Sequence, residues 1–147
     1  MTALPPGLPA ADPKRAAFHL TTYAQDVRFG AGALDQLAEA VAALGWRRVV
    51  VVTTGSARRS GRAARVAGWL GERLAAVFNQ TQPHVPAAQV AEVTTLAAAR
   101  AADALLALGG GSAIGLAKAA AAQLGVPVAA IPTTYAGSEM TAVYGIT

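Results

Sequence analysis

Four consecutive valines, at positions 49–52, set the strongest constraint on what this 147-residue chain can fold into. β-Branched side chains favour strands, and this run is apolar at both alternating sets of positions. A strand with one solvated face would instead alternate apolar and polar residues. The run therefore predicts a parallel strand over 48–53 that is covered on both faces.

Other strand-like and helical segments alternate with this run along the chain. Apolar residues at helical spacing predict helices at 34–44, 59–74, 86–97 and 113–124. Short apolar runs predict strands at 75–78, 104–108 and 126–131, and two extended segments at Phe18–Tyr23 and Val27–Phe29. Such alternation is typical of βαβ units. We therefore predict an α/β fold with a Rossmann-like, doubly wound, mostly parallel sheet.

The first part of the chain differs in composition from the rest. Four of the eight prolines fall within the first thirteen residues, which predicts a disordered lead-in at 1–17 and one domain over 18–147. That lead-in has no basic start followed by an apolar run, so it does not read as a secretory signal. Prolines interrupt the longest uncharged stretch, 119–138, which argues against a membrane span. We expect a cytoplasmic protein with no membrane partner.

A net charge of +4 and a pI of about 10.1 raise the possibility of a nucleic-acid partner. Arg58, Arg62 and Arg65 would share one helical face. No aromatic residues interleave with them, so we favour a solvated helix face and no nucleic acid, with a basic nucleic-acid binder kept as a rival. The chain has no cysteine and only two histidines, His19 and His84, which are isolated from other metal ligands, so we expect no metal bound by this chain.

Three glycines and a serine, Gly109, Gly110, Gly111 and Ser112, follow the strand expected at 104–108. Without side chains the backbone can approach a phosphate closely, and the amides opening the next helix favour an anion. We expect Ser112 to cap that helix. The spacing is neither GxGxxG nor GxxxxGK[ST], so the prediction of a phosphate site rests on the strand, turn and helix context. Lys118, further along, either reaches the ligand or lies in solvent.

The loop after the strand expected at 126–131 is rich in hydroxyl groups. Neutral hydroxyls suit hydrogen bonding to a ribose, an amide or a phosphate. Its one acid, Glu139, fits a turn or ion-pair role better than that of a base. The hydroxyl side chains are those of Thr133, Thr134, Tyr135, Ser138 and Thr141.

Together these two loops resemble a known family. The segments GGGSAIGLAKAAA and VPVAAIPTTYAGSEMTAVYGIT, with VRFGAGALDQL and HVP before them, are similar to the amino-terminal, dinucleotide-binding half of the iron-type alcohol dehydrogenases. Within that family the maleylacetate reductases are the most similar branch. The resemblance covers roughly residues 18–147 and implies NADH or NADPH as cofactor. It implies that Gly109, Gly110, Gly111 and Ser112 bind the pyrophosphate and that Thr133, Thr134, Ser138, Thr141 and Val143 close over the cofactor.

Three features depart from the commoner family pattern. Gly115 stands where most members have an aspartate, and the PTTYAGSE loop is short, both as in the maleylacetate reductase branch. Thr54 stands where many members hold the adenosine ribose with an aspartate, so Thr54 is a cofactor-binding candidate and the choice between NADH and NADPH stays open.

The resemblance implies an NAD(P)H-dependent oxidoreductase that reduces maleylacetate to 3-oxoadipate in aromatic compound degradation. It places the family's catalytic and metal residues in a second, all-helical domain, absent here. We therefore expect a domain that is truncated at its C-terminus and inactive alone. Its expected partners are the helical domain or a complementary chain, and a small dicarboxylate substrate. We expect the complete protein to form a homo-oligomer. Tyr135 is the candidate closest to the reacting groups. The rivals are an alcohol or glycerol dehydrogenase fragment and a non-catalytic nucleotide-binding remnant.

Overall fold

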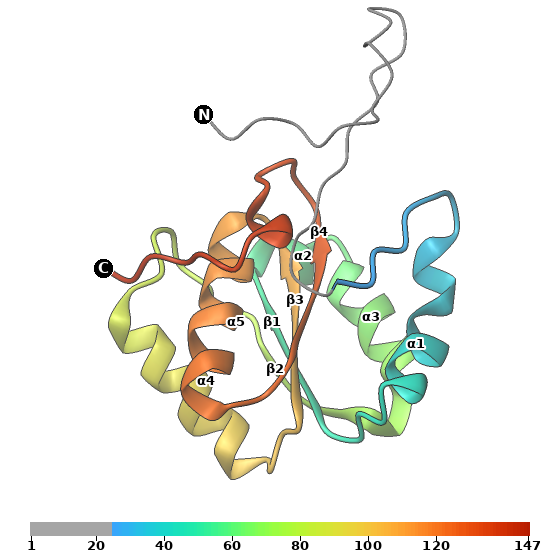
Figure 1. Cartoon of the computed structure of the whole chain (residues 1–147), viewed down its shortest axis with the longest axis horizontal. Coiled ribbons are helices and arrows are strands. Elements are labelled where there is room, and N and C mark those ends of the chain that lie inside the picture. The colour runs from blue at the N-terminus through green and yellow to red at the C-terminus, as the bar shows by residue number, and fades with distance from the viewer. Residues whose placement is uncertain (1–24) are drawn as a thin grey trace, which may run out of the picture.

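The computed structural model of the chain describes residues 25–147. The lead-in expected at 1–17 and the extended segment expected at Phe18–Tyr23 lie outside these described residues. A four-stranded, all-parallel sheet with the order β2-β1-β3-β4 forms the centre of the structure (Figure 1). The predicted Rossmann-like α/β fold is confirmed. The strands are β1 (Val49–Thr53), β2 (Leu74–Phe78), β3 (Ala104–Gly109) and β4 (Val128–Pro132).

Helices cover both faces of this sheet, α4 and α5 on one side and α1 and α3 on the other (Figure 1). The α-helices are α1 (Leu37–Ala43), α2 (Gly55–Arg59), α3 (Arg62–Leu70), α4 (Ala87–Ala99) and α5 (Gly111–Leu124). Three short 3-10 helices accompany them: η1 (Ala33–Gln36), η2 (Gly71–Arg73) and η3 (Ser138–Met140).

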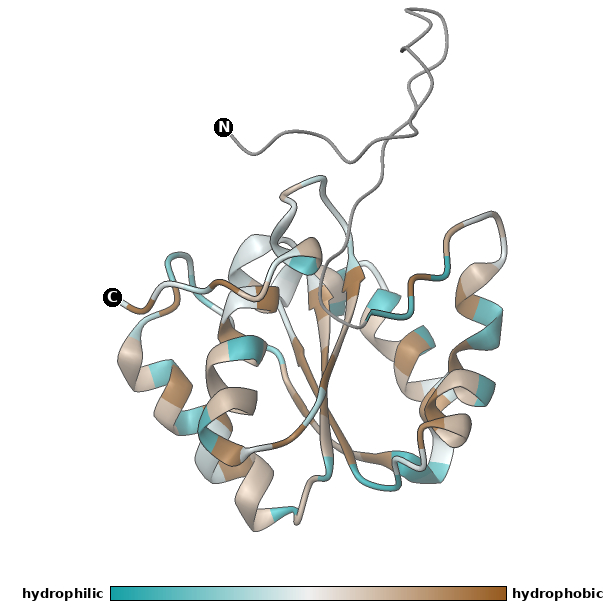
Figure 2. Cartoon of the chain, in the orientation of Figure 1, coloured by the Kyte–Doolittle hydropathy of each residue, from teal (hydrophilic) through white to brown (hydrophobic). Residues whose placement is uncertain are grey.

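The alternating side chains of the strands build two separate cores. Val50, Val52 and their neighbours at 105 and 107 pack under α4 and α5, whereas Val49, Val51 and Leu106 pack under α1 and α3. Figure 2 shows the strands as the most hydrophobic part of the ribbon, with hydrophilic residues on the outer turns of the helices. A strand buried on both faces needs apolar residues at every position, as the valine run predicted.

The order of the strands creates a switch in chain direction. The crossover through α3 carries the chain from β1 out to β2, and the crossovers through α4 and α5 carry it back past β1 to β3 and β4. The connections after β1 and β3 therefore leave toward opposite faces of the sheet. In open α/β sheets this point, at the carboxyl ends of the strands, is where ligands bind.

Two predicted helices have other bounds in the structure, and one extended segment is unpaired. In place of the helix expected at 59–74, α2 ends at Arg59 and α3 covers only Arg62–Leu70, because Gly61 between them adopts a left-handed conformation with φ of +77°. Arg58 consequently lies on a different helix from Arg62 and Arg65. The segment Val27–Phe29 pairs with no described strand, and its two hydrophobic ends are exposed. The helix expected to start at 113 starts at Gly111.

The packing of the central strand generates a prediction of stability. Leu106, on β3, is 0% exposed, so Leu106→Ala leaves a cavity in the core beneath α3. We expect a loss of about 2–5 kcal/mol in the free energy of unfolding, measured by urea denaturation. Leu44→Ala is the matched control because Leu44 is 56% exposed. Equal losses for the two variants would contradict the described core.

Candidate functional site

Hydrogen bonds join the carboxyl ends of the three strands at the switch point. The buried Thr53 hydroxyl, at the end of β1, donates to the carbonyl of Leu108 in β3 at 2.7 Å. The amide of Thr133, after β4, donates to the carbonyl of Gly109 at 3.0 Å. The connections after β1, β3 and β4 therefore lie next to one another. Chain segments about 80 residues apart in sequence are fixed here by the sheet.

In the turn between β3 and α5, positions 109 and 110 have room for glycine only. Gly109 has φ of +157°, and a Cβ atom built on it would lie 2.8 Å from Cβ of Ala113. A Cβ on Gly110 would lie 2.7 Å from Oγ1 of Thr134, and one on Gly111 would lie 3.5 Å from a side chain in the same loop. The loop after β4 therefore lies directly against the glycine turn, in agreement with the pairing of the two predicted loops.

The turn leads straight into the 14-residue helix α5. Its N-cap is Gly110, which offers no side-chain bond, so the expectation that Ser112 caps this helix is wrong. The reason is that the chain turns at Gly109 and adopts helical geometry two residues earlier than expected. The first amides of a helix have no intrahelical acceptor and carry the positive end of the helix dipole. With no side chain on Gly110 itself, this end of α5 suits an anion such as a phosphate.

Thr54 follows β1 and lies beside the same turn. Its hydroxyl accepts a hydrogen bond from the amide of Ala57 at 3.3 Å and lies 2.9 Å from the hydroxyl of Ser56, so it caps α2. Its methyl group lies 3.8 Å from where a Cβ on Gly109 would be. The guanidinium of Arg59 folds back over this corner, with Nη1 at 3.3 Å from the Cβ position of Gly55. The corner is therefore hydroxyl-rich and cationic, with no carboxylate from residues 53–59.

Lys118 does not lie free in solvent, one of the two roles considered from the sequence. Its ammonium donates to the backbone carbonyls of Ser138 at 2.8 Å, Thr141 at 3.1 Å and Val143 at 2.5 Å. Burial lowers the pKa of Lys118, and the nearby charge of Glu139 raises it in part. Glu139 itself has a buried Oε2 atom without a hydrogen-bond partner among the described residues. The lysine ties α5 to the loop after β4.

A second tie holds the far end of that loop. The amide of Thr147 donates to the carbonyl of Val85 at 3.2 Å, and its hydroxyl donates to the carbonyl of His84 at 2.7 Å. Both loop residues have positive φ values, +64° at His84 and +51° at Val85, which are strained for side chains of these kinds. Val85 points at α5, where a Cβ on Gly115 would lie 2.9 Å from its Cγ2. This contact explains the glycine at 115.

One supporting residue could not be found from the sequence. Gln89 is only 5% exposed, and its side chain accepts from the amide of Gln82 at 2.8 Å and donates to the carbonyl of Gln80 at 2.7 Å. It thereby fixes the loop between β2 and α4. A glutamine inside a helical apolar pattern carries no sequence signal for this role.

The predicted site residues divide into two groups. The glycine turn with Ser112, Thr54, Thr133 and Thr134 comes together at the carboxyl ends of the strands. Ser138, Thr141 and Val143 lie further along α5 and give their carbonyls to Lys118. Tyr135 is fully exposed at the loop tip and contacts neither group through a hydrogen bond among the described residues.

The comparisons with known proteins agree with this geometry. A model of the iron-containing alcohol dehydrogenases matches residues 24–147, most of the chain. The chain belongs to the iron-containing alcohol dehydrogenase family. It is 47% identical over 121 residues to a maleylacetate reductase of Burkholderia cepacia, an alignment that covers 82% of this chain and 34% of that protein. The chain thus spans about a third of the length of this relative.

Solved structures of the family share the fold. A maleylacetate reductase from Rhizobium sp. strain MTP-10005 is 37% identical with a TM-score of 0.81, covering 89% of this chain and 37% of that one. A sulfoacetaldehyde reductase from Bifidobacterium kashiwanohense, solved in complex with NAD+, is 27% identical with a TM-score of 0.75, covering 84% of this chain and 39% of that one.

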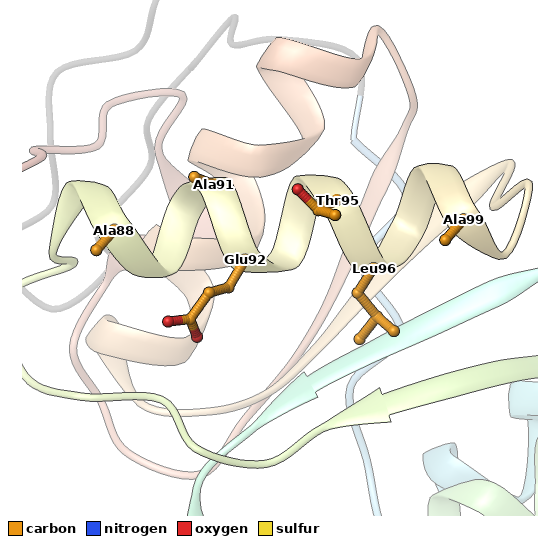
Figure 3. A pocket seen from close by; sticks show the side chains of 6 residues that line it. All are labelled: Ala88, Ala91, Glu92, Thr95, Leu96 and Ala99. Atoms are coloured by element: carbon orange, nitrogen blue, oxygen red, sulfur yellow. The ribbon is translucent and has the colours of Figure 1, made fainter.

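Two hollows lie outside the glycine turn. Arg62, Arg65 and Trp69 line a groove of about 250 Å³ that reaches the end of β4, and Arg65 lies over the Trp69 ring at 5.0 Å. The other, of about 580 Å³, lies along α4 and is lined by small side chains with Glu92 and Leu96 (Figure 3). All its labelled residues come from that one helix, so it offers no converging polar groups.

The family name implies iron, but the described residues do not provide its ligands. Within 25–147, no three His, Asp or Glu side chains gather closely enough to hold a metal ion. We therefore assign no iron ligand in this part of the chain. Within the same residues, no helix is both long and apolar enough to cross a membrane.

Proposed function

We propose that this chain forms the dinucleotide-binding part of an NAD(P)H-dependent oxidoreductase similar to maleylacetate reductase. In the proposed reaction a hydride from the dihydronicotinamide and one proton add to maleylacetate, giving 3-oxoadipate and NAD(P)+. The observation that carries the proposal is the glycine turn at the start of α5, where a Cβ on Gly110, the N-cap residue, would lie 2.7 Å from Oγ1 of Thr134. Identities of 40–47% to maleylacetate reductases of several bacteria support the choice of substrate.

The described residues fit the parts of a dinucleotide. The amides of the turn and the α5 dipole suit the pyrophosphate, and the hydroxyls of Thr133 and Thr134 lie beside it. Thr54 and Arg59 suit the adenosine ribose or its 2′-phosphate. Tyr135, exposed at the loop tip, stays our candidate for contact with the nicotinamide or the substrate.

The rest of the proposed machinery lies beyond these residues. We propose that an all-helical part supplies the catalytic groups and the contacts to the substrate dicarboxylate, and that the complete protein is a cytoplasmic homo-oligomer. An alcohol or glycerol dehydrogenase is the second candidate. Gly115 and the short loop after β4 argue against it, because Val85 occupies the space that a side chain at 115 would need. A non-catalytic nucleotide-binding protein is the third.

Filling the glycine turn tests the cofactor site. Gly110→Val places a branched side chain where Cβ alone would lie 2.7 Å from Oγ1 of Thr134. Because the side chain both displaces that threonine and blocks the helix amides, we expect NADH and NADPH to bind more than tenfold more weakly, about 1.4 kcal/mol. Nicotinamide fluorescence measures the dissociation constants. Gly68→Ala, with nothing within 4 Å of its Cβ, is the control. Unchanged affinity in a folded Gly110→Val variant would exclude the turn as the pyrophosphate site.

The corner after β1 predicts the choice of cofactor. We expect NADPH to bind at least as well as NADH, because residues 53–59 include no carboxylate and place Arg59 beside Gly55. Thr54→Asp retains an N-cap for α2 while adding a charge that repels a 2′-phosphate, so it shifts preference toward NADH. Arg59→Ala weakens NADPH binding alone. Binding of NADH a hundredfold more tightly than NADPH by the unmodified chain would refute this assignment.

An activity assay tests the proposal that this chain binds the cofactor and a helical part supplies the catalytic groups. We expect these residues alone to turn over maleylacetate far more slowly than about 1 per second, the lower end for typical enzymes. Hydride transfer needs the acceptor carbon held about 3–3.5 Å from the nicotinamide and groups that stabilise the developing charge. NAD(P)H oxidation is followed with the chain alone and with the helical part of a complete homologue added. Full activity of the chain alone would show that the catalytic groups are not supplied by a helical part. Nucleotide binding without activity, both for the chain alone and with the helical part added, would favour a non-catalytic nucleotide-binding protein.

A further inference from the structure

The ammonium of Lys118 donates its hydrogen bonds to one chain segment. An ammonium has three N–H groups, and three carbonyls accept them, those of Ser138, Thr141 and Val143. The lysine also lies seven residues after Gly111, about 10 Å along the helix from the turn at about 1.5 Å per residue. It is therefore not placed to bind the phosphates that the turn would hold.

The segment that Lys118 holds, residues 138–147, forms a strap across α5. It continues the loop that lies on the glycine turn and runs over α5 to the loop before α4 (Figure 1). Thr147 fixes its far end through His84 and Val85. Along the first half of α5, Ala113 to Ala117 are all buried, which a helix with one solvated face would not show. The strap lies on the side of α5 that bears Lys118.

The strap and the glycine turn are linked by a short stretch of chain. Thr134 and Ala136 lie against Gly110 and Gly111, and Ser138, two residues further, is bound to Lys118. A change at the lysine therefore reaches the side chains over the turn through four residues of backbone. Three bonds from a charged donor, each stronger than a neutral hydrogen bond, hold this stretch in place.

We propose that Lys118 is a positioning residue, which holds the strap and thereby fixes Thr133 and Thr134 over the glycine turn for nucleotide binding. This inference rests on the proposed function. The partly buried Glu139, within the strap, supplies the counter-charge near the ammonium, which makes burial of the lysine tolerable. The lysine stabilises the site without contacting the cofactor, in contrast to the lysine of a P-loop.

Replacing the lysine tests this role. In Lys118→Met we expect the dissociation constant for NADH to rise at least tenfold and amide hydrogen exchange across 138–147 to accelerate at least tenfold. Exchange in β1 and β3 stays unchanged, because the lysine makes no bond to the sheet among the described residues. Lys118→Arg retains the charged donors and restores both values to within threefold. Arg47→Met is the control for charge, since among residues 25–147 the side chain of Arg47 makes no hydrogen bond, and its backbone amide is bonded to Asp103 at the opposite end of the sheet. If Lys118→Met does not fold, Lys118→Gln takes its place with the same expected direction.

The outcomes separate the two proposals. If the unmodified chain binds neither NADH nor NADPH, the proposed function is overturned and the positioning role with it. If the unmodified chain binds NADH, and the folded Lys118→Met variant has a dissociation constant within threefold of its value, the positioning role alone is overturned. This holds whether or not amide exchange in the strap is faster. If Arg47→Met weakens NADH binding as much as Lys118→Met does, the weaker binding is due to the change in net charge, and the positioning role is overturned.

Discussion

The close approach of Thr134 to Gly110 is the contact on which the rest of the site depends. A side chain at 110 would displace the loop after β4, and a side chain at 109 would collide with Ala113 in the first turn of α5. The glycines at 109 and 110 are therefore a requirement of packing before they are a requirement of ligand binding. The same contact brings the hydroxyl of Thr134 to the start of α5, where, under the proposed function, the first helix amides bind the pyrophosphate.

This contact also orders the segments around it. Because the loop after β4 must lie on the turn, the strap that follows this loop crosses α5. The backbone carbonyls of the strap then face a helix that is otherwise alanine-rich. Lys118 satisfies those carbonyls, and Gly115 leaves room for Val85 beneath the far end of the strap. The strained backbone at His84 and Val85 persists because Thr147 bonds to both residues from outside.

Local pattern was enough to predict most of the fold, and less of the site. The valine run and the alternation of elements predicted all four strands and most helices, because burial on both faces leaves a direct trace in the sequence. The split at Gly61 was missed, since a glycine within a helical pattern is often tolerated. The roles of Gln89 and Lys118 could not be predicted, because their partners are backbone groups at other points of the fold.

The charges of the site follow from the same packing. Lys118 is the one cation of the two loops, and its donors are already occupied by carbonyls. Under the proposed function, the negative charge of the pyrophosphate is therefore balanced by helix amides and hydroxyls, which act as fixed dipoles and need no reorientation on binding. Dipoles of this kind suit a cofactor that must be held in one place and released after each turnover. A dicarboxylate substrate needs free cations, and within these loops none remains. Under the proposed function, the groups that recognise the substrate lie in the part of the relatives that this chain does not match, which is the greater part of their length.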